Sequence, residues 1–118
     1  MKVLIVQEQT FLATALRLAL LSRGYELIVS NENIPPSHAL DIYNPNIVIA
    51  DITRGSNFRY VEEARKKNVP VIVICNNGDE DQINKAFEKG ADDYISMPLS
   101  FTELAIKVDL LTQKSAVA

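Results

Sequence analysis

Two carboxylates, Glu8 and Asp51, follow short apolar runs at residues 3–6 and 47–50. Both runs are rich in Val and Ile and show no polar alternation, which is typical of central strands in a parallel sheet. Carboxylate oxygens suit a small hard cation such as Mg²⁺, and an aspartate beside such a cation can accept a phosphoryl group. Two carboxylates are a weak signal, however, and such residues more often cap the next helix or face water.

The remaining side chains exclude several classes of function. The 118 residues include 12 basic and 15 acidic ones, well mixed along the chain, with a net charge of −3. A nucleic-acid binder neutralises phosphates with clustered Lys and Arg, so we expect no direct contact with nucleic acid. His38 is the only histidine and has no partner at a metal-ligand spacing. The four glycines form no phosphate-binding loop, which argues against nucleotide binding.

The length and composition favour one domain with its own core. Hydrophobic residues make up 47% of the chain, and we predict a single domain over residues 1–118 with a flexible tail at 113–118. The lone Cys75 lies in an apolar run, which favours a reducing, cytoplasmic setting. We expect no signal peptide and no membrane contact, because the apolar run at residues 11–21 is interrupted and too short to span a bilayer.

Strand and helix patterns alternate along the chain. Strand patterns cover residues 3–6, 27–29, 47–50, 71–75 and 94–95. Helical patterns lie between and after them, at residues 12–23, 35–44, 57–68, 79–90 and 100–112. Asp79 or Asp81 is expected to cap the fourth helix, and Ser100 with Glu103 forms a capping box for the fifth.

This alternation predicts an α/β fold, a (βα)5 doubly wound sheet of five parallel strands. Sheets of this kind bind their ligands at the carboxyl ends of the strands, near the switch point in strand order. Six residues stand at these strand ends: Gln7, Glu8, Asp51, Cys75, Asn76 and Met97.

Four stretches match the motifs of one known family in the same order and spacing. The longest is GADDYISMPLSFTEL at residues 90–104, similar to the family pattern G-A-D-D-Y-h-x-K-P-F-x-x-x-E-L, in which h is apolar. The others are KVLIVQEQ at residues 2–9, PNIVIADIT at 45–53 and VPVIVICN at 69–76. The chain resembles a response-regulator receiver domain of two-component phosphorelay signalling over almost its whole length. The resemblance implies the flavodoxin-like receiver fold.

The resemblance also implies roles for individual residues. Asp51 stands at the phosphoacceptor position, and Glu8 stands at the second of two acidic metal positions. The backbone carbonyl of Thr53 stands where the family completes the coordination shell of the metal ion. Tyr94 falls on the switch aromatic, whose ring turns inward on activation. Pro98 falls on a proline that commonly follows a cis peptide bond.

Several working parts of the family's site are replaced in this chain. Gln7, a neutral amide, stands at the first acidic metal position. Cys75 stands in place of a hydroxyl residue that hydrogen-bonds the phosphoryl group, and a thiol is a weaker donor. Met97 stands in place of the lysine that holds a phosphoryl oxygen. The loop after the phosphoacceptor is also altered, with Arg54 either supplying positive charge or, as we favour, simply exposed.

These replacements predict a degenerate acidic pocket. A charge-assisted hydrogen bond contributes about 1.5–3 kcal/mol, so the combined losses remove several such contributions from an aspartyl phosphate. We expect any Mg²⁺ bound by Glu8, Asp51 and the Thr53 carbonyl to be weakly held, and no other cofactor.

Three interpretations of function remain open. The first is an atypical or pseudo-receiver that acts through protein–protein interaction, with a histidine kinase, an effector domain or another signalling protein as partner. The second is a conventional receiver switched by an aspartyl phosphate at Asp51. The third and most remote is a small enzyme on a flavodoxin-like sheet, for which the chain lacks a nucleophile–base pair. We therefore predict that the chain is not an enzyme.

The predicted output surface is formed by the fourth helix, the fifth strand and the fifth helix. The resemblance extends, through Asp92, Asp93 and Glu103, to regulators that form homodimers through these elements. Four charged residues are expected at the rim of this surface: Lys85, Asp92, Asp93 and Lys107. Asp109 differs, because those regulators usually carry a basic residue at its position.

Overall fold

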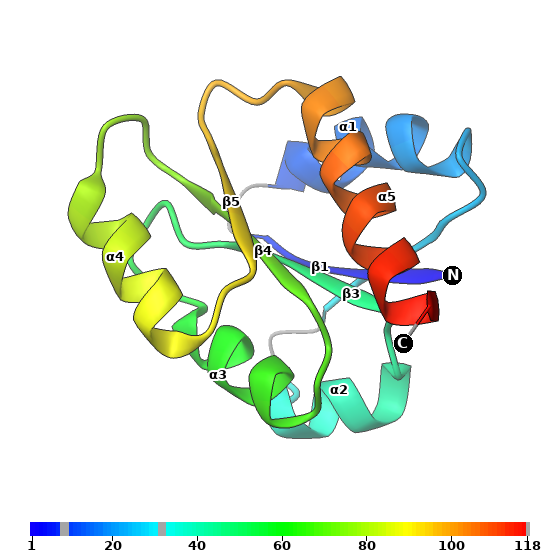
Figure 1. Ribbon diagram of the computed structural model, residues 1–118, viewed down its shortest axis with the longest axis horizontal. Helices are drawn as coiled ribbons and strands as arrows, with labels where there is room; N and C mark the ends of the chain where they lie inside the picture. Colours follow the sequence, from blue (N-terminus) through cyan, green and yellow to red (C-terminus); the bar gives the residue numbers. More distant parts are fainter. Residues whose placement is uncertain (8–9, 31–32, 118) are drawn as a thin grey trace.

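Five parallel strands, each followed by a helix, form the molecule (Figure 1). The structure is a computed structural model that describes residues 1–7, 10–30 and 33–117. The strands are β1 (Lys2–Val6), β2 (Glu26–Val29), β3 (Ile47–Asp51), β4 (Val71–Cys75) and β5 (Asp93–Ser96). The helices are α1 (Thr10–Leu21), α2 (Pro36–Tyr43), α3 (Phe58–Lys66), α4 (Glu80–Lys89) and α5 (Phe101–Val117). The predicted (βα)5 fold is confirmed.

The strand order brings the candidate site residues to one edge of the sheet. The order is β2-β1-β3-β4-β5, and all neighbouring strands pair in parallel. The chain runs from β1 outward to β2 and then crosses to β3 on the other side of β1, so the switch point lies between β1 and β3. Val6 pairs with Ala50 at this point. Gln7 and Asp51, the next residues, therefore lie at the same edge.

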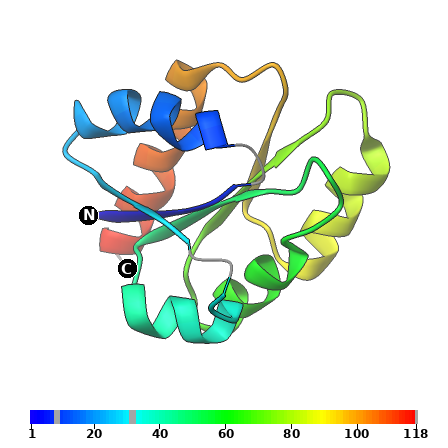
Figure 2. The same ribbon diagram turned by 180° about the vertical axis from the view of Figure 1, so that it is seen from behind.

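Helices cover both faces of the sheet, as Figures 1 and 2 show. α1 and α5 cover one face, where Leu16 and Leu104 are buried against the strands. α2, α3 and α4 cover the other, where Val61 and Ala86 are buried. Every residue of β3 and β4 is buried, which explains why these runs lack polar alternation. In the part of the chain that is described, no helix is both long and apolar enough to cross a membrane.

Local signals set the ends of α4 and α5. The side chain of Asp79 caps α4, and the hydroxyl of Ser100 accepts a hydrogen bond from the backbone N–H of Glu103 at 3.2 Å, as predicted. Gly90 ends α4 with a φ of +114°, and a Cβ at this position would lie 2.3 Å from Cδ of Arg65. Both the left-handed backbone and the close approach therefore favour glycine here.

α5 is tied to the segment that connects α1 to β2. Its backbone is helical through Val117, and the flexible tail at 113–118 stays a prediction. Asp109 forms an ion pair with Arg23 and accepts a hydrogen bond from the hydroxyl of Tyr25 at 2.6 Å. Burial, followed by the hydrogen bond with Asp109, raises the pKa of Tyr25. Asp109 thus stabilises the packing of α5 where the resembled regulators carry a basic residue.

Candidate functional site

Asp51 ends β3 with its carboxylate engaged inside the protein. The residue is only 2% exposed. Its Oδ1 accepts two hydrogen bonds from Thr53, one from the backbone N–H at 3.0 Å and one from the hydroxyl at 2.6 Å. The side chain of Asn57 donates to the backbone carbonyl of Asp51 at 2.7 Å. The loop after β3 therefore folds back on Asp51 and uses its carboxylate as an acceptor.

The positions that follow β1 are described only in part. Glu8, predicted as a metal ligand, lies outside the described residues. Gln7 is described, and its Oε1 accepts a hydrogen bond from the backbone N–H of Ala13 at 2.9 Å. Ala13 lies at the start of α1. The amide oxygen of Gln7 therefore serves the helix terminus.

Two side-chain amides meet at the backbone carbonyl of Thr53. This carbonyl stands where receiver domains use a backbone oxygen as a metal ligand. Nδ2 of Asn76 donates to this oxygen at 2.7 Å, and Nε2 of Gln82 lies 3.3 Å from it. Nε2 of Gln82 also donates to the carbonyl of Ile52 at 3.0 Å, and its Oε1 accepts from the backbone N–H of Asn76 at 3.1 Å. We call Asn76 and Gln82 the amide clamp.

The sequence analysis did not identify Gln82. The spacing from Asp79 to Gln82 matches a capping box, in which the second residue reaches back to the cap. Half of this pattern is present, because Asp79 accepts from the backbone N–H of Gln82 at 3.0 Å. The side chain of Gln82 instead reaches the loops that follow β3 and β4. The spacing of Asp79 and Gln82 therefore pointed to Gln82, but as a capping residue and not as a link between two loops.

Cys75 and Met97 pack against β5 and the core. Cys75 is fully buried, with Sγ 3.6 Å from the carbonyl of Ile95 and 3.7 Å from the hydroxyl of Ser96. Burial raises the pKa of its thiol, which therefore stays protonated near neutral pH. Met97 packs against the core beneath α1 and α5. The Met97–Pro98 peptide bond is cis, as the resemblance implied.

A cavity of about 620 Å³ lies beside the Asp51 site, toward β2. This volume falls within the range of small-molecule pockets, roughly 300–1,000 Å³. Its polar lining consists of Gln7, Ser30, Asn33, Arg54, Ser56, Asn57 and Tyr60. Arg54 is exposed and lines part of this cavity. Burial is the main reason that the pKa of Tyr60 is raised.

The described residues do not form a ready Mg²⁺ site. Asp51 and Thr53 offer hard oxygen atoms of the correct kind, but Oδ1 of Asp51 and the carbonyl of Thr53 already accept hydrogen bonds. Among the described residues, no group of three or more His, Cys, Asp or Glu side chains is arranged to hold a metal. Mg²⁺ requires nearly ideal octahedral geometry. A cation at this edge would have to displace existing hydrogen bonds.

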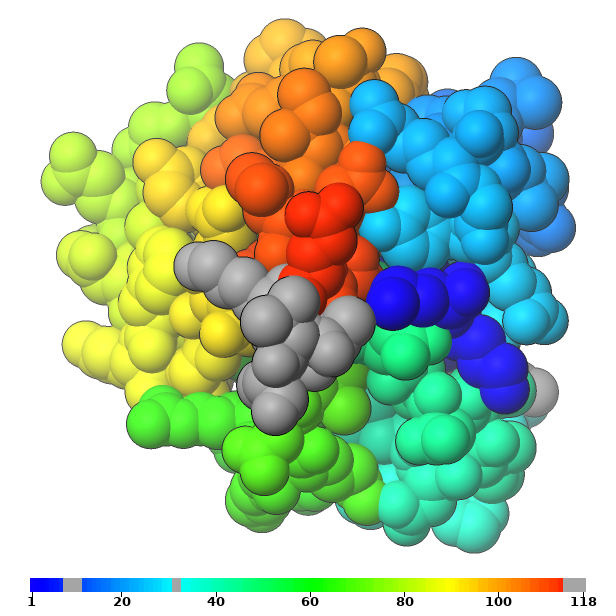
Figure 3. Space-filling model, turned by 45° about the vertical axis from the view of Figure 1, so that its right-hand side comes forward, coloured from blue at the N-terminus to red at the C-terminus, as the bar shows by residue number. Residues whose placement is uncertain are grey.

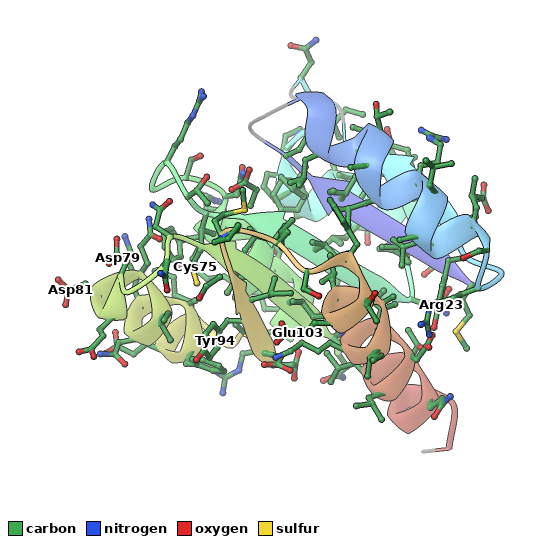
Figure 4. All side chains as sticks on the ribbon, turned by 90° about the horizontal axis from the view of Figure 1, so that it is seen from above. Arg23, Cys75, Asp79, Asp81, Tyr94 and Glu103 are labelled. Atoms are coloured by element: carbon green, nitrogen blue, oxygen red, sulfur yellow. The ribbon has the colours of Figure 1, made fainter. Side chains whose placement is uncertain are left out.

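The predicted output surface carries an accessible aromatic pair and an ion pair. The Tyr94 ring is 37% exposed and meets Phe87 of α4 edge to face, with 6.0 Å between the ring centroids. Nζ of Lys107 lies 3.0 Å from both Oδ1 of Asp93 and the carbonyl of Tyr94. Figure 4 shows Tyr94 on the side of β5 between α4 and α5. We call Phe87, Asp93, Tyr94 and Lys107 the α4–β5–α5 face.

Lys85 and Asp92, which were also predicted for this surface, contact other elements. Nζ of Lys85 lies 4.4 Å from the centroid of the Phe58 ring in α3. The carboxylate of Asp92 accepts a hydrogen bond from the backbone N–H of Val71 at 2.8 Å, at the start of β4. Sequence spacing alone does not give the direction of these side chains. Asp93 and Lys107 are therefore the predicted charges that meet at the face.

Comparison with known proteins places these observations in a family context. No protein-family model matches the chain. The chain is 28% identical over 120 residues to the phosphate regulon transcriptional regulatory protein PhoB of Pseudomonas aeruginosa, covering 96% of this chain and 52% of the relative. It is 22% identical over 119 residues to the cell cycle transcriptional regulator CtrA of Caulobacter vibrioides, covering 98% and 52% respectively. The chain spans about half the length of these curated relatives.

A solved response regulator receiver domain protein from Clostridium thermocellum matches the fold. Its TM-score is 0.79 at 20% identity, with 98% of this chain and 97% of that chain covered. The match extends over the whole sheet and both helical layers. The relatives and the flavodoxin-like fold together support a response-regulator receiver domain of two-component signalling.

Proposed function

We propose that this chain is an atypical receiver in phosphorelay signalling, whose partners dock on the α4–β5–α5 face without a phosphorylation switch at Asp51. The proposed partners are a histidine kinase, an effector domain or another signalling protein. A second copy of the chain, docked through the same face, is a further proposed partner.

The observation that carries this proposal is the engagement of the Asp51 carboxylate inside the protein. It is 2% exposed and accepts two hydrogen bonds from Thr53. Phosphoryl transfer depends mainly on positioning and on neutralisation of charge. Met97 supplies no charge where the family has lysine, and the thiol of Cys75 contacts β5. An aspartyl phosphate on Asp51 would therefore lack much of its usual stabilisation.

The α4–β5–α5 face combines exposed rings with charges in fixed positions. Phe87 is 41% and Tyr94 37% exposed, and aromatic residues are enriched among strong contributors to protein interfaces. Nζ of Lys107 lies 5.7 Å from the centroid of the Tyr94 ring and donates to Asp93. These contacts favour the outward position of the ring in the absence of any ligand. A two-state switch would need a ligand that prefers one state.

Weak binding of Mg²⁺ through Glu8 and Asp51 is part of the same proposal. Gln7 replaces one of the family's two acidic ligands, so one negative charge is lost. We expect an affinity in the millimolar range or weaker. Titration with MgCl₂, followed by the amide NMR shifts near Asp51, measures it, and micromolar affinity would contradict the proposal.

The main alternative is a conventional receiver switched by an aspartyl phosphate at Asp51. Intact-mass spectrometry after treatment with acetyl phosphate, with and without Mg²⁺, separates the two functions. The atypical receiver should gain no phosphoryl group, and the ring signals of Tyr94 should not change. A Mg²⁺-dependent mass increase that disappears in Asp51→Asn, together with shifted Tyr94 signals, would establish the conventional switch instead.

A further inference from the structure

We propose that the amide clamp, Asn76 and Gln82, holds the Asp51 site closed to divalent cations and fixes the start of α4 against the loop after β3. The inference rests on the proposed function, because it treats this edge of the sheet as the counterpart of a receiver's metal site. It adds a cause for the weak cation binding that is separate from the loss of charge at Gln7.

The hydrogen bonds of Gln82 link three segments of the chain. Its side-chain N–H groups donate to the carbonyls of Ile52 and Thr53, at 3.0 and 3.3 Å. Its side-chain oxygen accepts from the backbone N–H of Asn76 at 3.1 Å, and its own backbone N–H donates to Asp79 at 3.0 Å. The loop after β3, the loop after β4 and the first turn of α4 therefore meet at one amide.

The clamp competes directly with a cation for the Thr53 carbonyl. A carbonyl oxygen has two lone pairs, and here Asn76 donates at 2.7 Å while Gln82 lies at 3.3 Å. A cation that approached this oxygen would have to displace at least one of these donors. Mg²⁺ gives up its own waters reluctantly, so it compensates poorly for the lost hydrogen bonds. The clamp therefore disfavours the cation-bound state.

The same hydrogen bonds fix the position of α4. Gln82 lies in the first turn of this helix, between Asp79, which caps it, and Phe87, which belongs to the α4–β5–α5 face. The clamp therefore holds the first turn of α4, and with it one side of the docking face, against the loop after β3.

The test compares clamp variants with matched controls. Gln82→Met keeps the length of the side chain but removes its donors, and Asn76→Ala removes the second donor. Asn84→Met and Asn77→Ala are the controls, since Asn84 lies exposed on the same helix and Asn77 exposed in the same loop. Each folded protein is titrated with MgCl₂ alone, and the amide NMR shifts near Thr53 are followed. No phosphodonor is present.

We expect each clamp variant to bind Mg²⁺ about fivefold to tenfold more tightly than the wild type, since one hydrogen bond contributes roughly this factor. The controls should match the wild type, and Asp51→Asn combined with Gln82→Met should lose the gain. Unchanged affinity in both folded clamp variants, or a gain that survives Asp51→Asn, would overturn the inference. Asn76→Ala provides the test if Gln82→Met does not fold. Failure here is distinct from failure of the proposed function, which is decided by acetyl phosphate treatment.

Discussion

Two regions of this domain use their polar side chains in opposite ways. Around Asp51, the hydroxyl of Thr53 donates to the carboxylate, the side-chain amide of Asn76 donates to the backbone carbonyl of Thr53, and Asp51 is 2% exposed. On the α4–β5–α5 face, Lys107 and Asp93 also pair, but their side chains remain 21% and 34% exposed beside the ring of Tyr94. Figure 3 shows that α5 itself is broadly exposed at the surface. The first region is built for internal contacts, whereas the second remains accessible.

The hydrogen bonds around Asp51 can therefore serve folding, whatever chemistry the pocket supports. A neutral hydrogen bond contributes about 0.5–1.5 kcal/mol to stability, whether or not the protein signals. The hydrogen bonds of Asp51, Thr53 and Gln82 therefore stabilise the loops for structural reasons alone. An exposed ion pair contributes less, roughly 0.2–1 kcal/mol. The ion pair of Asp93 with Lys107 therefore contributes little to folding.

The largest expected effect comes from restoring the chemistry of the pocket. The triple variant Gln7→Asp, Cys75→Thr and Met97→Lys returns a carboxylate, a hydroxyl and a positive charge. We expect phosphorylation by acetyl phosphate to reach at least about ten times the detection limit that bounds the wild type, because one charge-assisted hydrogen bond contributes about 1.5–3 kcal/mol. Intact-mass spectrometry in the presence of Mg²⁺ measures the increase.

The control for this experiment is the same triple variant with Asp51→Asn, which should gain no phosphoryl group. Met97 packs against the core beneath α1 and α5, so the fold of the triple variant must be checked by amide NMR. If the folded triple variant is phosphorylated no better than the wild type, the altered loop from Arg54 to Arg59 is what blocks the reaction. The low reactivity of Asp51 would then come from this loop and not from the residues at positions 7, 75 and 97.

The second prediction tests whether Asp51 serves folding. Asp51→Ala removes the acceptor of two hydrogen bonds from Thr53 in a buried site. An unsatisfied buried donor costs about 1–3 kcal/mol, so we expect the free energy of unfolding to fall by about this amount. Asp51→Asn keeps an oxygen that can accept these bonds and should lose less. Urea denaturation of both variants measures the difference, and equal stability of Asp51→Ala and wild type would show that the contacts are not structural.

Most of the fold followed from residue pattern alone. The buried runs at residues 47–50 and 71–75, the periodic leucines of α1 and the capping residues of α4 and α5 all carry local signals. The parallel order then follows from the repeated alternation of strand and helix. The extent of α5 was underestimated, because residues 113–117 carry no strong cap or stop signal.

The site could be predicted only in part. Strand ends located Asp51 and the family resemblance located Tyr94, because both depend on position along the chain. The amide clamp was missed, because Gln82 acts through contacts about 30 residues away in sequence, with Ile52 and Thr53. Lys85 and Asp92 were assigned to a surface from their place on an element, which does not reveal side-chain direction.

The third prediction concerns the ion pair of the face. Asp93→Lys and Lys107→Asp each replace an attraction by a repulsion, and we expect either to weaken self-association or partner binding about tenfold, since buried interfacial charges left unpaired are costly. Stability should fall by less than about 1 kcal/mol, because the pair is partly exposed. Sedimentation velocity and denaturation measure the two effects. The same assays on Asp51→Ala should show nearly normal association.

The double exchange, Asp93→Lys with Lys107→Asp, is the matched control. It restores the ion pair within the protein and should recover stability, but it reverses the charges presented to a partner. Docking should therefore remain weak in the double exchange. If docking recovers fully in the double exchange, the face is not a standing docking site that presents these charges to a partner. If Asp51→Ala abolishes association while the charge reversals do nothing, the face is not a standing docking site and Asp51 is a working switch.

The smallest expected effect is a dependence of stability on alkaline pH, which tests whether the thiol of Cys75 is shielded from water against β5. Burial raises the pKa of this thiol above its value in the unfolded chain. The stability that this shift contributes is fully present below the unfolded-state pKa and is lost as pH rises through the higher native pKa.

Cys75→Ala should be less stable at neutral pH, because it leaves a cavity, but its free energy of unfolding should fall less steeply on the alkaline side. Tyr25 and Tyr60, whose pKa values are also raised, titrate in both proteins, so the difference between the two curves isolates the thiol. Urea denaturation across a neutral-to-alkaline series measures both curves. Parallel curves would mean that the thiol ionises as it does in the unfolded chain, and that its site against β5 is open to water.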